Sequence, residues 1–300
     1  MYYFLSMLSG ILIAFMILMN GELTAHNGVY TATVMIHIIG LLFILFLMLV
    51  KRKELLPGKK LPWFYYLGGV IGVCNTVFNN LAFGIISVSA ILALGLLGQS
   101  IASIIIDEFG LFHMAKRRFD RRKLVGLALV LSGVLYITEL SSFDTLALQV
   151  GIPLLLAVIV SFASGITTVL SRTVNSLLAH STNVWKSTLY NYVTGLFVAV
   201  IVLFLLGRQE PDPLTAGLSP DLWIYLGGIL GVFVVFLANA IVSKISSFYM
   251  TLLLFIGQVF TGLILDAFLS QSFSLERLIG GILVAAGLSF NLWMDKLSSR

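Results

Sequence analysis

The sequence predicts an all-α integral membrane protein with ten transmembrane helices, arranged as two inverted five-helix repeats. Three observations predict it: the composition, the number of long apolar segments and an internal repeat. Hydrophobic residues make up 59% of the 300 residues and charged residues only 10%, which leaves too little polar surface for a soluble globule. We therefore expect a multi-pass protein of the inner (plasma) membrane, with the lipid bilayer as its surroundings.

Ten apolar segments are long enough to be membrane helices, because a hydrocarbon core about 30 Å thick needs roughly 20 apolar residues. The first has no basic stretch before it and no small-residue cleavage site after it, so it is expected to be a retained helix. The segments lie near 3–22, 29–50, 64–83, 86–106, 123–139, 149–170, 184–206, 223–243, 247–265 and 279–294.

Basic residues cluster between these segments, and such clusters favour the cytoplasmic side. With the N-terminus inside, only Arg208 and Arg277 fall outside, and both termini are expected in the cytoplasm. The other sixteen Lys and Arg are Lys51, Arg52, Lys53, Lys59, Lys60, Lys116, Arg117, Arg118, Arg121, Arg122, Lys123, Arg172, Lys186, Lys244, Lys296 and Arg300. The net charge of +5 therefore reflects membrane orientation, and no nucleic-acid partner is expected.

The internal repeat is clearest between residues 64–109 and 223–268, which share 15 identities over 46 positions at a shift of 159 without a gap. Polar identities and glycines cannot come from shared hydrophobicity. They include Gly68/Gly227, Gly69/Gly228, Gly72/Gly231, Asn80/Asn239, Gly98/Gly257, Gln99/Gln258 and Asp107/Asp266. The chain is therefore interpreted as two copies of one unit.

The rest of the unit is repeated as well. At a shift of 155, matches include Gly10/Gly165, Asn20/Asn175, Thr33/Thr188 and Gly40/Gly195, and at a shift of 154 they include Gly126/Gly280 and Gly133/Gly287. Five helices is an odd number, so the second copy must enter the membrane from the opposite side. We expect a first repeat over residues 1–140 and an inverted second repeat over 141–300, the geometry of alternating-access transporters. A monomer is possible because one chain carries both repeats.

Two five-helix units, each with Gly-Gly-x-x-Gly in the third helix and Gly-Gln-x7-Asp-x-Phe in the fourth, resemble the YdcZ-like branch of the drug/metabolite transporter (DMT) superfamily. The resemblance covers essentially the whole chain and makes it look like the fused form of a family that includes single five-helix proteins. It implies the DMT fold and a small-molecule transporter, often an exporter, but it supplies no substrate.

Gln99 and Gln258 each precede an aspartate by eight residues, or about 12 Å along a helix. Asp107 and Asp266 end their helices on opposite faces, so both amides are expected near the midplane, where inverted-repeat transporters bind substrate. Alternatively, each Gln holds helices together. A helix-end role beside Lys or Arg is the favoured interpretation of the aspartates, and proton relay is the alternative.

Asn75 and Asn79 lie on one face of the third helix, below Gly68 and Gly72. Their aligned residues, Val234 and Ala238, are apolar, so these amides are candidates for a solute contact rather than for packing. The full set of expected substrate-binding residues is Asn20, Asn75, Asn79, Asn80, Gln99, Ser103, Asn239, Gln258 and Thr261.

Two titratable residues are candidates for proton coupling. Glu22 is expected near the outer boundary of the first helix, where a solvated interfacial carboxylate is the alternative interpretation. His37 is the one histidine deep within an apolar segment, and histidine titrates near neutrality. A hydrogen-bonded interior histidine is the alternative.

No metal-ligand spacing, phosphate-binding loop or nucleophile motif is present, so neither an enzyme nor a cofactor or metal is expected. The leading hypothesis is a secondary active transporter, an exporter of a small polar or cationic metabolite by alternating access, with proton coupling as one option. A flippase or scramblase for a lipid-linked headgroup is the second hypothesis, and a membrane scaffold without transport the third.

Overall fold

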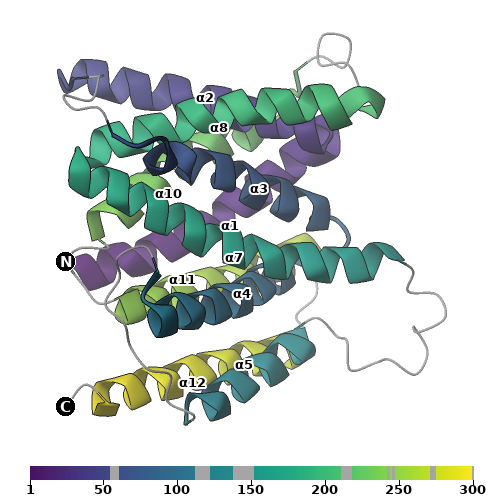
Figure 1. The fold of residues 1–300 in the computed structure, drawn as a ribbon. Helices are drawn as coiled ribbons and strands as arrows, with labels where there is room; N and C mark the ends of the chain where they lie inside the picture. The colour runs from purple at the N-terminus through teal and green to yellow at the C-terminus, as the bar shows by residue number, and fades with distance from the viewer. Residues whose placement is uncertain are drawn as a thin grey trace. The chain divides into compact units, whose positions relative to one another are not determined.

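The computed structural model describes residues 1–54, 61–111, 122–137, 152–210, 218–241, 244, 247–270 and 275–298, and all helices below lie within them. Ten α-helices are found there and no strand (Figure 1). They are α1 (Tyr2–Asn27), α2 (Val29–Val50), α3 (Leu67–Ala82), α4 (Val88–Phe109), α5 (Lys123–Ile137), α7 (Ile152–Ser181), α8 (Val184–Leu206), α10 (Leu226–Ile241), α11 (Ser247–Ser270) and α12 (Leu275–Ser298). The prediction of an all-α protein with ten helices is confirmed.

The expected segments and the helices agree most closely at α2 and α8, which begin and end where the apolar runs do. The largest difference is at α7, which continues to Ser181 instead of ending near residue 170. Arg172, counted above among the loop cations, therefore lies inside a helix. Most of the two basic stretches, at 55–60 and 112–121, lies outside the described residues.

Six helical segments within the described ranges are long and apolar enough to cross a membrane: those of α1, α2, α4, α7, α8 and α10. Shorter apolar helical segments lie in α5, α11 and α12. The helix α3 has 16 residues, about 24 Å at 1.5 Å per residue. It carries amides where the others carry aliphatic side chains, which is why hydropathy alone ranks it lowest.

Local signals explain several helix ends. The Ser87 side chain accepts a hydrogen bond from the Ala90 N–H at 3.3 Å and caps α4, and Gly110 ends that helix in a left-handed conformation with φ of 62°. The Asn183 side chain caps α8 by accepting from the Lys186 N–H at 2.9 Å. Ser and Asn at the N-cap and Gly after the last turn are the usual terminating residues.

The described chain forms two compact units, described separately below. Unit 1 comprises Met1–Ala14, Ala82–Ile166 and Ile245–Arg300, and unit 2 comprises Phe15–Leu81 and Thr167–Lys244. Each unit combines segments from both sequence repeats, so the two units are not the two repeats. The repeat boundary near residue 140 stays a prediction.

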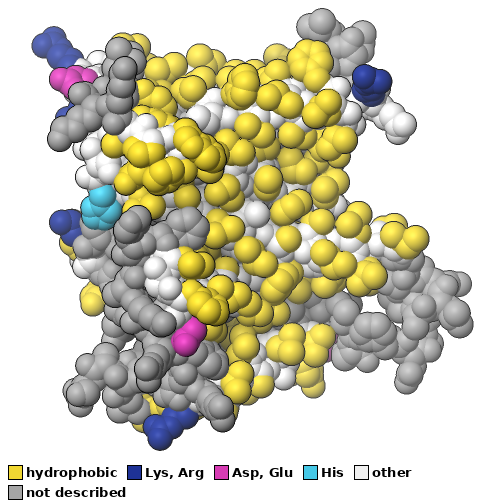
Figure 2. All heavy atoms as spheres, viewed as in Figure 1, with side chains coloured by type: hydrophobic (Ala, Val, Ile, Leu, Met, Phe, Trp, Pro, Cys, Tyr) yellow, Lys and Arg dark blue, Asp and Glu magenta, His cyan; other side chains and the backbone are white. Residues whose placement is uncertain are grey.

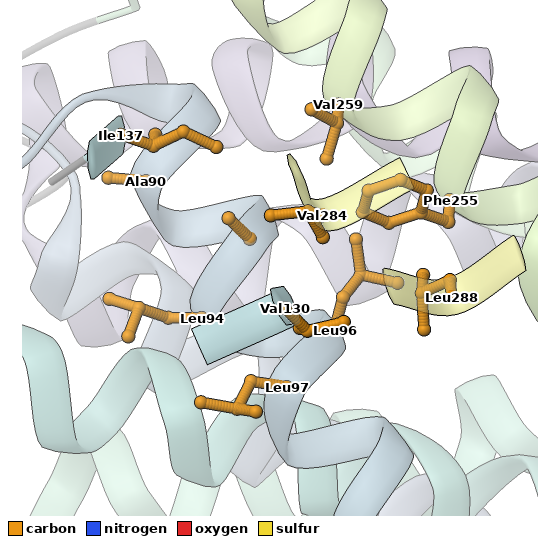
Figure 3. Close-up of a cluster of buried hydrophobic side chains, with 11 residues drawn as sticks. Ala90, Leu94, Leu96, Leu97, Val130, Ile137, Phe255, Val259, Val284 and Leu288 are labelled. Carbon is orange, nitrogen blue, oxygen red and sulfur yellow. The ribbon is translucent and has the colours of Figure 1, made fainter. Parts of the chain in front are cut away.

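The core of unit 1 lies among α4, α5, α11 and α12. Figure 3 shows side chains from these four helices converging, among them Leu96, Val130, Phe255 and Val284, all completely buried. Aliphatic and phenyl groups of this kind each contribute about 1.5–3 kcal/mol when withdrawn from water. Inside a bilayer the same contacts act through close packing rather than through the hydrophobic effect.

Unit 2 has two smaller apolar clusters. One packs Ile44 and Met48 of α2 against Leu189 and Tyr192 of α8. The other groups Leu23, Ala32, Ile36 and Ile224. The paired helices α2 and α8 thus form the main apolar contact of unit 2.

The described surface remains strongly apolar. Figure 2 shows hydrophobic side chains over most of the face in view and few charged ones. Phe197, Phe204 and Leu205 of α8 are 69%, 74% and 69% exposed, and Phe46 of α2 is 58% exposed. Bulky side chains of this kind face lipid in a membrane protein.

Candidate solute-binding site

The polar side chains of unit 2 form two groups that differ in burial. The first is a buried network on α7 and α8. Asn175 Nδ2 donates to Asn191 Oδ1 at 2.8 Å, Ser171 Oγ donates to the Gly68 carbonyl at 2.7 Å, and Ser187 Oγ donates to the Asn175 carbonyl at 2.6 Å. These side chains are buried and hydrogen-bonded, as expected of groups that join helices in a membrane.

The second group is half-buried and spans α3 and α7. Asn75 Nδ2 donates to Thr168 Oγ1 at 2.6 Å, and Asn79 Nδ2 lies 3.5 Å from Asn75 Oδ1. None of the three is fully buried. The structure therefore brings together the two amides that the sequence singled out and adds a threonine from α7.

The helices α3 and α7 run antiparallel at this point. A Cβ added to Gly68 would meet the Asn175 side chain, one added to Gly72 would lie 3.5 Å from Ser171 Oγ, and Asn75 bonds to Thr168. Moving along α3 toward Asn79 therefore moves toward the start of α7. The glycines allow the close approach, and the amides follow where the glycines end.

Arg172 lies one turn beyond Thr168 on α7, nine residues before the helix ends at Ser181. Its side chain is half-buried. It makes no hydrogen bond or ion pair with any residue that the structure describes. A guanidinium has five N–H donors and stays charged, so a half-buried arginine without a partner is a polar group that the fold itself does not satisfy.

The other expected amides of unit 2 are buried. Asn80 Nδ2 lies 3.4 Å from Thr33 Oγ1, and Asn239 Nδ2 donates to Ser187 Oγ at 3.3 Å. Asn20 faces Gly227, and its Oδ1 has no hydrogen-bond partner among the described residues. These residues are placed to join helices rather than to line a half-open site.

The two proton-coupling candidates differ in exposure. Glu22 is half-buried near the end of α1. His37 is 4% exposed, its Nδ1 lies 2.8 Å from the Thr33 carbonyl, and its ring packs on Tyr192. The environment of His37 matches the interior, hydrogen-bonded alternative.

In unit 1, Gln99 of α4 and Gln258 of α11 are 6% and 2% exposed. Neither side chain makes a hydrogen bond with a residue in the described ranges. Ser103 and Thr261 lie one turn further along the same two helices and are half-buried. The helix-joining interpretation of the glutamines has no hydrogen bond in its support here.

Asp266 is buried, and its two carboxylate oxygens accept hydrogen bonds from the N–H groups of Val88 and Ser89, each at 3.0 Å. Both donors belong to the first turn of α4, where backbone N–H groups lack partners within the helix and attract negative charge. The expected helix-end role is thus realised on the end of a neighbouring helix. The side chain of Asp107 lies outside the described part of the chain.

Sequence reasoning missed Thr168 and Arg172, and also the buried Ser171 and Asn191. A signal existed, because at the shift of 155 these residues align with Ile13, Ile17, Met16 and Ile36. A comparison that looks for polar residues opposite apolar ones would have found them. The analysis above used the alignment mainly to collect identities.

Ten apolar helices with amides buried among them define a polytopic membrane protein. The family described as "Putative inner membrane exporter, YdcZ" matches residues 1–136 and 156–290. The chain belongs to this YdcZ family of the DMT superfamily, so it is an inner-membrane transporter and not an enzyme, and the expected resemblance is confirmed.

Among solved structures, one titled "Crystal structure of protein" is 14% identical with a TM-score of 0.61, and the alignment covers 97% of this chain and 99% of that one. At that identity the match shows a shared fold alone. No curated protein matches the chain.

Proposed function

We propose that this protein is a secondary active transporter that exports a small polar solute by alternating access between two inverted repeats. The observation that carries the proposal is a set of contacts in which aligned residues exchange partners. Such exchange is expected when a pseudo-two-fold axis relates two copies, because each contact i to j then has a partner contact j to i.

The pair of α5 and α12 gives the first example. A Cβ on Gly126 would meet the Gly287 carbonyl, and one on Gly133 would meet the Gly280 carbonyl. Gly126 aligns with Gly280 and Gly133 with Gly287. Repeats related by an axis along the membrane normal would have the same orientation, so their equivalent helices would run parallel. The crossed contacts instead make α5 and α12 antiparallel, as inversion requires.

A second example lies in the same unit. Gly10 of α1 packs on Leu254 and the backbone N of Gln258. Gly165 of α7, which aligns with Gly10, packs on Gly95 and the backbone N of Gln99. The first helix of each repeat therefore contacts the Gly-Gln segment of the other repeat, and it does so through glycine in both cases.

Inverted repeats give a transporter two equivalent gates around one solute site. Buried glutamines without hydrogen bonds to described residues, and the half-buried amides of α3, support a polar solute contact. Of the two candidates for proton coupling, Glu22 is the better supported, because it is half-buried whereas His37 is packed against a tyrosine. We include proton exchange at Glu22 in the proposal.

The test is flux in proteoliposomes. A panel of amines, amino acids, carboxylates and phosphate esters is screened by thermal shift on the purified protein, and each stabilising compound is assayed with and without a pH gradient. We expect Gln99→Ala combined with Asn79→Ala to abolish flux and Gln258→Ala to reduce it. The melting temperatures of the folded variants should change little.

Two results would contradict the proposal. Equal losses from all three substitutions, in proportion to lost folded protein, would make these amides structural. Movement of fluorescent lipid between leaflets, without flux of any stabilising solute, would favour the scramblase alternative.

A further inference from the structure

We infer that Arg172, together with Asn75, Asn79 and Thr168, binds the anionic group of the transported solute, a carboxylate or a phosphate. This inference rests on the proposed transport function and specifies its substrate class. It replaces the cationic solute considered from the sequence, because an unpaired guanidinium at the site would repel a cation.

The first step is position. Asn75 bonds to Thr168 at 2.6 Å, and Asn79 continues the amide chain along α3. Residues four apart on a helix share a face, with Cβ atoms about 5–6 Å apart, so Arg172 lies beside Thr168 on α7. The long arginine side chain can reach this distance, and the four polar groups therefore form one local cluster within unit 2.

The second step is lack of internal satisfaction. Polar groups placed only for structure are hydrogen-bonded when buried, as Asn175, Asn191 and Ser171 are. Arg172 has no such partner among the described residues. A charged residue in a membrane helix is costly, and such residues are usually functional.

The third step is the difference between the repeats. Asn75, Asn79, Thr168 and Arg172 align with Val234, Ala238, Ile13 and Ile17, so all four polar residues have apolar counterparts. Asn20/Asn175, Asn80/Asn239 and Gln99/Gln258 keep the same residue in both copies. A solute near a pseudo-two-fold axis has its charged end on one side only, and this one-sided polar cluster matches such a ligand.

The fourth step is chemistry. The planar guanidinium can donate two parallel hydrogen bonds to a carboxylate or phosphate, which an amine cannot match. Amide N–H groups of Asn75 and Asn79 and the Thr168 hydroxyl are further donors suited to the remaining anion oxygens. Two sources of such an anion have to be distinguished: a soluble metabolite, and the phosphate of a lipid headgroup.

The experiment measures binding on the purified full-length protein in detergent by thermal shift and calorimetry. The probes are succinate, benzoate and inorganic phosphate, with ethylammonium and spermidine as cations, and dioleoylphosphatidylglycerol micelles as the lipid arm. The variants are Arg172→Gln and Arg172→Lys. Arg208→Gln, which removes one exposed arginine outside the cluster, is the matched control for net charge.

We expect at least one soluble anion to stabilise the wild type and Arg208→Gln. Its dissociation constant should rise at least tenfold in Arg172→Gln and by less in Arg172→Lys, which keeps the charge without the planar fork. If Arg172→Gln does not fold, the contrast between Arg172→Lys and the wild type decides. Asn79→Ala should also weaken the anion without altering spermidine.

Stabilisation by cations alone, by lipid alone, or equally in Arg172→Gln and the wild type would overturn the assignment. Flux of the bound anion tests transport separately. An anion that binds through Arg172 but never crosses proteoliposomes would sustain the site and sink the transporter, whereas flux of an amine unaffected by Arg172→Gln would do the reverse.

Discussion

The rings of His37 and Tyr192 pack against each other across α2 and α8, with centroids 5.9 Å apart and planes inclined by 53°. Each ring occupies space left by a glycine on the opposite helix: the ring of Tyr192 lies over Gly40, and that of His37 over Gly195. His37 aligns with Tyr192 and Gly40 with Gly195 at the shift of 155. The contact is therefore reciprocal, as a pseudo-two-fold axis between α2 and α8 would make it.

Alanine at either glycine should destabilise the protein. A methyl group on Gly40 would overlap the Tyr192 ring, and one on Gly195 would lie 2.6 Å from His37 Cδ2. Overpacking of this kind costs about 1–3 kcal/mol, so both variants should melt several degrees lower in detergent, followed by tryptophan fluorescence.

The matched control for these two variants is Gly72→Ala. Its added carbon would lie at ordinary contact distance, 3.5 Å from Ser171 Oγ. Alanine is also the better helix former, so its melting temperature should be unchanged or higher. An equal loss in Gly72→Ala would show that the steric reason given for Gly40 and Gly195 is wrong.

The sequence was sufficient to predict the helices whose apolar runs end at polar caps. The helix α8 is an example, since Asn183 caps it and the run from Val184 is unbroken. It was insufficient at α7, because hydropathy treats Arg172 as the start of a loop. Arginine is in fact a good helix former, and α7 continues until Ser181, just before the Asn183 cap.

The same physics limited the site. Asn75 and Asn79 were predicted because amides on one face of an apolar helix are conspicuous. Thr168 was missed because a threonine in a membrane helix usually bonds to its own backbone and carries no signal. Its contact with Asn75 joins residues 93 positions apart, and no local pattern contains such a contact.

Asp266→Ala should destabilise unit 1. The carboxylate accepts two hydrogen bonds from the start of α4, and its loss leaves two buried N–H groups unpaired, at about 1–3 kcal/mol. Asp266→Asn keeps one acceptor oxygen but no charge, so its melting temperature should lie between the two. Asp221→Ala removes an exposed aspartate with no side-chain capping bond and should leave the melting temperature within error. A proton-relay role would instead predict that Asp266→Asn melts normally but loses its response to a pH gradient.

Glu210→Ala should loosen the start of α2. Gly28 precedes that helix and has no side chain to cap it, and Glu210 accepts from the N–H groups of Tyr30 and Thr31, both at 2.8 Å. A lost cap costs about 0.5–2 kcal/mol. Hydrogen exchange should therefore rise in residues 30–33, with a small loss in melting temperature. Gln209→Ala, which removes the exposed neighbouring side chain, serves as the control, and equal exchange in both variants would refute the capping role.

Glu54→Ala should expose a cost at Lys186. The lysine side chain is 7% exposed and its Nζ lies 3.1 Å from Glu54 Oε2, while the glutamate side chain is 87% exposed. Removing the exposed partner leaves a buried ammonium unpaired, which is more costly than the loss of an ordinary surface pair. The melting temperature should fall, and Lys186→Met in the same background should restore it. Failure of the second substitution to restore stability would show that the ion pair contributes nothing.

Both termini should lie in the cytoplasm, because fifteen of the basic residues remain on that side once Arg172 is assigned to α7. Labelling of single cysteines in a Cys74→Ser background measures this with a membrane-impermeant maleimide on intact cells. Lys53 and Leu218 are exposed positions that follow α2 and precede α10. Leu218→Cys should react from outside, and Lys53→Cys only after permeabilisation. Basic residues are retained on the cytoplasmic side during insertion, so reversed labelling of both sites would refute the orientation. Labelling of both from the same side would instead contradict the predicted helix count between them.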